Sequence, residues 1–135
     1  MQDYVRLQTA MLLRRLAYQV SRAAKSGDAE SIHDLRVAIR RFSRCLRVFS
    51  QFYPGNSWKK MRRRLSGLMA AAGAVRDLDI AIELLAGAGM RSNRQLLSKL
   101  EQERRQASRE LIQEVHHWNN QGFSKKWRSS LGLSA

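Results

Sequence analysis

Apolar residues recur every three or four positions along almost the whole chain, and sustained alternation of apolar and polar residues is absent. This spacing is typical of amphipathic helices that bury one face. Turn-forming residues interrupt it at 26–27, 53–56, 87–89 and 119–122. The sequence therefore predicts helices over about 3–25, 29–52, 57–85, 92–118 and 123–131. Gly73 leaves open whether the third of these is one helix or two joined helices.

Short connections between long helices favour antiparallel neighbours. We therefore expect an all-α fold, an antiparallel up-down four-helix bundle with a short C-terminal helix. A chain of 135 residues can bury one modest core, and no linker, repeat or low-complexity tract divides it. We expect residues 1–135 to form a single domain.

The chain carries 25 Lys and Arg against 11 Asp and Glu, a formal charge of +14. Counting along the sequence, residues 1–76 contribute +12 and residues 77–135 contribute +2. Such a charge attracts anions at long range, so nucleic acid, an anionic membrane, an acidic protein and an inorganic polyanion are all possible partners. We expect the first half of the chain to supply the anion-binding surface.

Other sequence features bear on the cellular compartment of the protein and on whether it can bind a metal or a membrane. Cys45 is the only cysteine, which rules out an intrachain disulfide and a pair of thiolate metal ligands. The N-terminal apolar stretches are interrupted by arginines, and no run approaches the roughly 20 apolar residues that span a bilayer. We expect a cytoplasmic protein with no metal, no cofactor and no membrane association.

One histidine and four arginines share a face of the second predicted helix. At 100° per residue they fall within an arc of about 80°, and apolar residues such as Leu35, Phe42 and Leu46 lie nearly opposite. We call this set the basic stripe; it consists of His33, Arg36, Arg40, Arg44 and Arg47. It extends over about 21 Å of helix, and guanidinium groups bind phosphate oxygens in pairs. Because a solvated face usually mixes signs and this one contains no acid, binding of a polyanion is favoured over simple solvation.

Two further clusters of charge follow. The start of the third helix is basic, and Lys59 and Arg63 are candidates to extend the same anion site. Arg76, Asp77 and Asp79 alternate in sign within a small-residue region, which indicates internal ion pairs rather than ligand contact.

Two segments together resemble a known family, the CHAD domain (conserved histidine α-helical domain). They are HDLRVAIRRFSR, from His33 to Arg44, and GAVRDLD, from Gly73 to Asp79. The resemblance runs through most of the chain. It implies an all-helical domain that binds inorganic polyphosphate, is associated with polyphosphate granules and has no catalytic activity of its own. Carried over by motif, the implied binding residues are His33, Arg36, Arg40, Arg41 and Arg44.

The chain departs from this family in one respect. A typical CHAD domain has two four-helix bundles with the anion between them, whereas this sequence supplies about one. Either a homodimer rebuilds the pair, which we favour, or the chain is a truncated and weaker binder. The main alternative function is nucleic-acid binding, although the aromatic residues mostly fall on predicted apolar faces rather than exposed ones. An enzyme is less favoured, because no activated nucleophile or metal site is evident.

Overall fold

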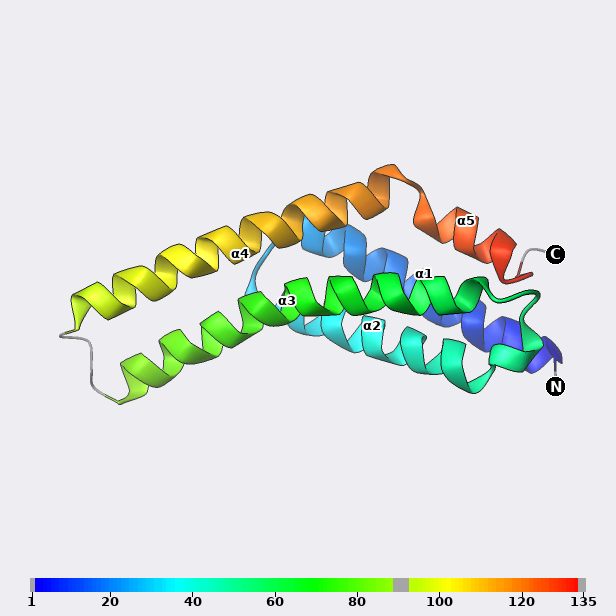
Figure 1. Cartoon of the computed structure of the whole chain (residues 1–135), viewed down its shortest axis with the longest axis horizontal. Helices are drawn as coiled ribbons and strands as arrows, with labels where there is room; N and C mark the ends of the chain where they lie inside the picture. Colours follow the sequence, from blue (N-terminus) through cyan, green and yellow to red (C-terminus); the bar gives the residue numbers. More distant parts are fainter. Residues whose placement is uncertain (1, 89–92, 134–135) are drawn as a thin grey trace.

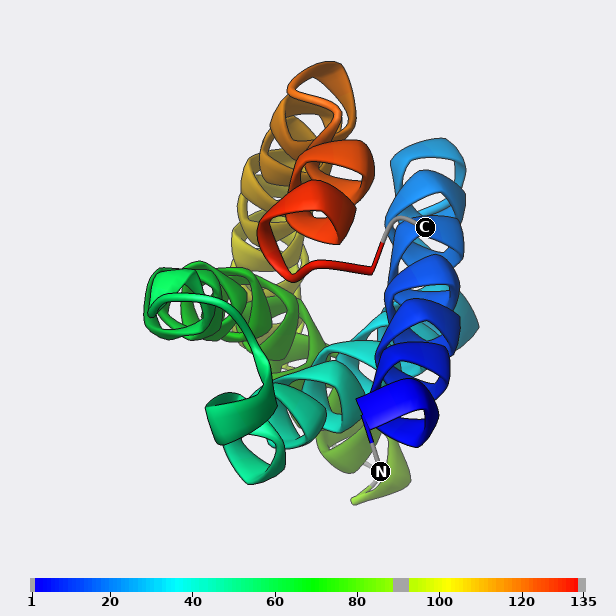
Figure 2. The same cartoon turned by 90° about the vertical axis from the view of Figure 1, so that its right-hand side faces the viewer.

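Four long helices pack around one core, and a short fifth helix closes one end. The computed structural model describes residues 2–88 and 93–133. Its helices are α1 (Gln2–Lys25), α2 (Ala29–Val48), α3 (Ser57–Gly87), α4 (Arg94–Asn120) and α5 (Phe123–Ser130), with a 3-10 turn, η1 (Ser50–Phe52). Helices α1 to α4 alternate in direction, each packs on the next, and α4 also packs on α1 (Figures 1 and 2). The predicted all-α bundle with a short C-terminal helix is confirmed.

Each long helix contributes large apolar side chains to the core. Leu16 of α1, Phe42 of α2, Leu68 of α3 and Trp118 of α4 are fully buried. Burying a side chain of this size contributes about 1.5–3 kcal/mol, so the periodic apolar face of each helix accounts for its place in the bundle. None of the helices within the described ranges is long and apolar enough to cross a bilayer.

Helix α5 seals the end of the core with an aromatic cluster. Gly122 adopts a left-handed backbone conformation (φ 62°) that turns the chain from α4 into α5. The Trp127 ring then stacks on Phe42 with centroids 6.0 Å apart, and it meets Trp118 edge-on at 5.3 Å. The sequence predicted this helix from the spacing of Phe123, Trp127 and Leu131, all of which are buried.

The second helix ends earlier than predicted. α2 stops at Val48, and Ser50–Phe52 form a 3-10 turn instead of continuing it to residue 52. The chain turns back towards α1 here, and the Tyr53 hydroxyl forms a hydrogen bond of 2.8 Å with the Thr9 hydroxyl of α1. Burial raises the pKa of Tyr53. Because Phe49 and Phe52 pack against the core on either side of the change, the apolar spacing did not reveal it.

The other predicted helix ends agree more closely with the structure. Asp28 caps α2 by accepting a hydrogen bond from the Ser31 backbone N–H at 2.8 Å, which holds the pKa of Asp28 below its usual value. α3 runs without a break through Gly73, so it is one helix. Asn93 caps α4, which begins at Arg94. The predicted start at Ser92 lies outside the described residues, as does Gly89.

Candidate anion-binding site

The basic stripe lies on the outer face of α2. On the opposite face, Leu35, Ile39 and Phe42 are at most 2 % exposed, which holds the helix in one orientation. Arg36 is half-buried, and the other members of the stripe are exposed: His33, Arg40, Arg44 and Arg47. This is the separation of faces that the helical angles predicted.

A groove with a volume of about 660 Å³ runs between α2 and α3. Four arginines and two serines line it, namely Arg40, Ser43, Arg44, Arg47, Arg62 and Ser66. Apolar side chains complete it, namely Ile39, Leu65, Met69 and Ala70. We call this the basic groove. The stripe is therefore not an isolated ridge, because three of its arginines form one wall of a cleft whose other wall belongs to α3.

Arg62 is the α3 residue that brings a fourth cation into the basic groove. Its Nε donates a hydrogen bond to the Ser43 hydroxyl of α2 at 3.3 Å, so the guanidinium is held across the cleft. Arg62 belongs to a run of five cations in residues 59–64, and five cations so close together on a helix cannot all share one face. Nothing in that run distinguished it from Lys60 or Arg64, because the distinction depends on which side of α3 packs on α2.

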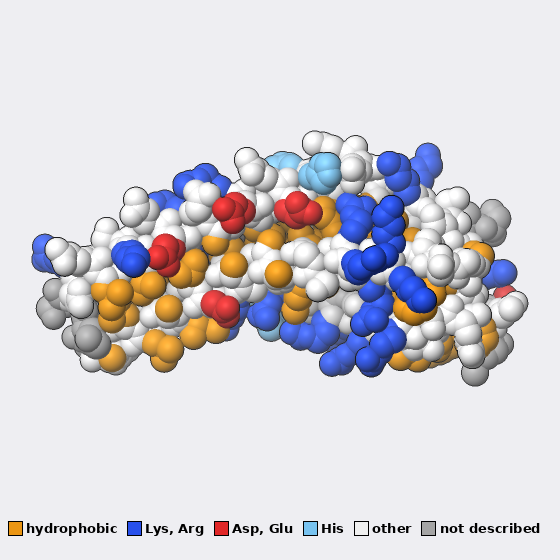
Figure 3. Space-filling view, viewed as in Figure 1, with side chains coloured by type: hydrophobic (Ala, Val, Ile, Leu, Met, Phe, Trp, Pro, Cys, Tyr) orange, Lys and Arg blue, Asp and Glu red, His pale blue; other side chains and the backbone are white. Residues whose placement is uncertain are grey.

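A second groove, of about 570 Å³, adjoins the first. It is lined by Trp58, Lys59, Arg62, Arg63 and Ser66, and it shares Arg62 and Ser66 with the basic groove. The structure thus places Lys59 and Arg63 in one groove with Arg62, which also lines the basic groove. Figure 3 shows the result as a band of Lys and Arg side chains that crosses α3 from the α2 side towards α4 and α5.

The positive charge of the basic groove is not neutralised within the protein. Over residues 2–88 and 93–133, the ion pairs involve only Arg22 and Arg104. Arg40, Arg44, Arg47 and Arg62 therefore have no carboxylate partner there, and their mutual repulsion favours a bound anion. Arg36 does not line the groove, and its Nε is buried and finds no acceptor among the described residues. A buried donor left in this way costs about 1–3 kcal/mol.

Of the eight expected binding residues, three line the basic groove, namely Arg40, Arg44 and Arg47. Lys59 and Arg63 line the adjoining groove, and Arg36 lines neither. His33 is exposed near the start of α2 and does not line the basic groove. Arg41 lies on the other flank of α2, where it lines a separate groove of about 480 Å³ against α1 with Arg14 and Arg15. The binding residues implied by the family resemblance therefore lie on two sides of α2. Arg40 and Arg44 line the groove towards α3, and Arg41 lines the groove towards α1.

Comparison with known proteins places the chain in a family. The family model of the CHAD domain matches residues 8–134. The chain belongs to the CHAD family. The resemblance noted in the sequence is therefore confirmed, and this family is commonly linked to polyphosphate binding. Searches among curated proteins and among solved structures found no match.

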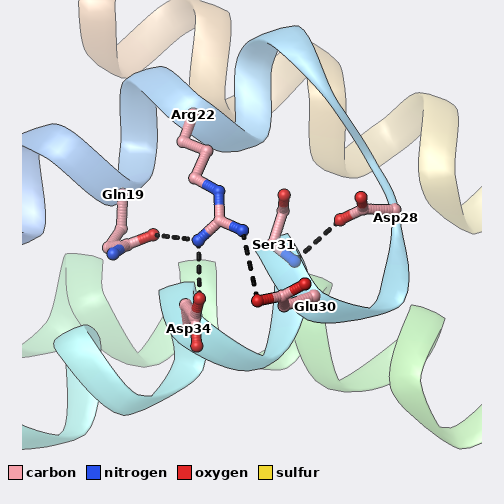
Figure 4. A network of polar contacts seen from close by, with 6 residues as sticks. All are labelled: Gln19, Arg22, Asp28, Glu30, Ser31 and Asp34. Atoms are coloured by element: carbon pink, nitrogen blue, oxygen red, sulfur yellow. Dashed lines mark hydrogen bonds and ion pairs between the residues drawn. The ribbon is translucent and has the colours of Figure 1, made fainter.

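Asp34, which follows the histidine in the first CHAD motif, faces α1 rather than the basic groove. Arg22 of α1 donates a hydrogen bond to its Oδ2 at 2.5 Å and also approaches Glu30 at 3.8 Å (Figure 4). The bond to Asp34 is the main cause of the raised pKa of Arg22. Glu30 and Asp34 thus pair with Arg22 of α1, while the third acid near the start of α2, Asp28, caps the helix.

The second CHAD motif contributes a structural ion pair. Asp79 Oδ1 accepts a hydrogen bond from Arg104 Nε at 2.5 Å, and the same guanidinium donates to the Gly27 carbonyl at 3.4 Å. Arg104 therefore joins α3, α4 and the α1–α2 loop. Arg76 and Asp77, which we also expected to pair, have no ion-pair partner in the described part of the chain.

The described residues contain no group of three His, Cys, Asp or Glu side chains that could hold a metal ion.

Proposed function

We propose that this CHAD domain binds inorganic polyphosphate in the basic groove. The observation that carries the proposal is the set of four arginines that line the groove without a carboxylate partner among the described residues. The family's link to polyphosphate supports the same ligand. A linear chain of phosphates offers repeated negative charge, which is what a cleft with cations along both walls can bind.

The spacing of the arginines supports a polymer over a single phosphate. Arg40, Arg44 and Arg47 extend over about 10 Å of α2, and Arg62 faces them from α3. A ligand that neutralises all four must therefore extend along the cleft. Guanidinium groups suit this role because they stay charged and can bind two phosphate oxygens at once.

The remaining residues would act at the margins of the groove. Arg36 lies one turn before Arg40 on the same face of α2, so its guanidinium would add positive charge beside the groove. Lys59 and Arg63 would extend the track across α3. His33 and Arg41 would bind parts of a longer chain that pass over the exposed face of α2.

We propose binding without turnover. The side chains that line the basic groove are arginines, serines and apolar residues. General acid–base catalysis needs a group that titrates near the working pH, whereas arginine stays protonated and serine needs an adjacent base. The lining of the groove supplies charge and hydrogen-bond donors, which are sufficient for capture of an anion.

Nucleic acid is the alternative ligand, and one observation favours it. Trp58 lines the groove next to the basic groove, and the ammonium group of Lys59 lies 5.6 Å from the centre of its ring. An aromatic ring beside cations can stack on a nucleobase. Trp58 is nevertheless half-buried and is the only aromatic residue in the lining of the two grooves, so repeated stacking along a strand has little support.

Competition distinguishes the two ligands. A labelled polyphosphate is bound to the protein and displaced by unlabelled polyphosphate, duplex DNA or duplex RNA at equal phosphate concentration. We expect polyphosphate to compete best, and better competition by either nucleic acid would overturn the choice. Arg40→Glu with Arg44→Glu should abolish binding. Arg105→Glu with Arg109→Glu, a pair of exposed arginines with the same spacing on α4, should weaken it much less.

Three further proposals accompany this one and follow from the family rather than from the groove. Residues 1–135 would act as one domain that supplies a single bundle. A homodimer would provide the second bundle. The protein would work in the cytoplasm, at polyphosphate granules.

A further inference from the structure

Helices α3 and α4 extend well beyond the rest of the bundle. The loop between α1 and α2 lies near the middle of the molecule, and past it only α3 and α4 continue, side by side (Figure 1). The contact of Arg104 with Asp79 and with the Gly27 carbonyl marks this boundary. We call the projecting part, residues 80–87 of α3 and 94–103 of α4, the two-helix arm.

The two-helix arm carries apolar side chains that its own two helices do not cover. Leu84 is 68 % exposed, Ile80 38 % and Leu96 39 %. Leu97 and Leu100 are half-buried. Figure 3 shows hydrophobic side chains gathered along the arm, whereas the cations gather over the four-helix part. Two packed helices bury only the stripe between them, and a stable layer of apolar side chains needs further helices on top of it.

Charge identifies what can cover this surface. The arm contains three glutamates against two Lys and Arg, so it is close to neutral within a chain of +14. An acidic protein or an anionic lipid surface would be drawn to the cationic part of the molecule instead. A second copy of this chain would be repelled by that part and could approach closely only through the nearly neutral arm.

We propose that the two-helix arms of two copies pack against each other and form the homodimer interface. Two helices from each copy together make a four-helix arrangement, which covers the exposed leucines in the way that α1 and α2 cover the other half of α3 and α4. A twofold contact of this kind uses the same surface of both copies. It holds the two highly charged parts of the dimer outside the interface. This proposal names the surface used by the homodimer and does not depend on which anion the basic groove binds.

The test is a mass measurement in solution without any polyanion, so that no ligand can bridge two copies. Sedimentation or light scattering is followed up to about 100 µM, which detects dimers with dissociation constants up to about that value. We expect a dimer for the unaltered chain. Leu84→Glu should shift the dissociation constant upwards at least tenfold, because it buries two like charges at the contact. Leu96→Glu, on the other helix of the arm, should act in the same direction.

Leu7→Glu is the matched control, because Leu7 is 71 % exposed on α1 and lies outside the arm. It should leave the dimer intact. A monomer at all concentrations for the unaltered chain would overturn the proposal, and so would a dimer that Leu7→Glu disrupts and Leu84→Glu does not. Circular dichroism of each variant establishes that it is folded. Polyphosphate binding is measured separately on the same samples, so failure of the interface and failure of the proposed ligand give different results.

Discussion

The salt dependence of binding gives the sharpest prediction for the basic groove. Four arginines line the cleft, and in the described structure none is neutralised by a carboxylate. A single-stranded polyanion that contacts four cations releases counterions so that the logarithm of affinity falls with the logarithm of salt with a slope of about −2.8. Raising the salt from about 50 to about 200 mM should then weaken binding about 50-fold.

Arg44→Gln removes one of the four contacts and keeps a side chain of similar length. The slope should become shallower by about 0.7, to about −2.1, and the same change of salt should weaken binding only about 20-fold. Fluorescence anisotropy of a labelled polyphosphate, titrated at five or six salt concentrations, measures both slopes.

Arg105→Gln is the control for net charge, because Arg105 is exposed on α4 and outside the groove. Its slope should match that of the unaltered protein. The reasoning is refuted if the two variants change the slope equally, since binding would then follow total charge and not the groove.

Further predictions concern the parts of the fold that position the groove. Asp79→Asn should lower the free energy of unfolding by about 1–2 kcal/mol, measured by urea denaturation, because it leaves the half-buried Arg104 guanidinium without its charged partner; an unchanged midpoint would contradict the role given to this pair. Trp127→Ala should cost about 3–5 kcal/mol in the same assay, because it opens a cavity in the aromatic cluster. The pKa of Asp28 is lowered by the Ser31 N–H, so its contribution is complete above the ordinary aspartate pKa of about 4 and is lost as the pH falls through the lowered folded-state pKa. Asp28→Asn keeps a capping oxygen that does not titrate, so this variant should lose less stability than the unaltered protein between about pH 4 and pH 2; equal losses would show that the cap is not responsible.

Much of the fold could be predicted because the apolar face and the cap of each helix depend on residues that are close together in the sequence. The apolar face of α2 and the Asp28 cap depend on residues within a few turns of each other, and both are present in the structure. The end of α2 could not be predicted in this way. It depends on a hydrogen bond between Tyr53 and Thr9, which are far apart in the sequence.

The candidate site was predictable in part for the same reason. The face shared by Arg40, Arg44 and Arg47 follows from helical spacing alone. The contribution of Arg62 and the separation of Arg41 follow from which side of α2 packs on α3 and which on α1, and that is a property of the tertiary structure. The arm formed by α3 and α4 also depends on the difference in length between neighbouring helices, and the sequence alone did not indicate that it would project.

The dependence of affinity on the length of the phosphate chain tests the central claim most directly. Isothermal titration calorimetry compares orthophosphate, short oligophosphates and long polyphosphate with the same protein at one salt concentration. Affinity per chain should rise steeply until the chain can contact the cations on both walls of the basic groove, and more gradually beyond that length. Equal affinity for orthophosphate and long polyphosphate would contradict the account, because the arginines would then act as separate surface charges.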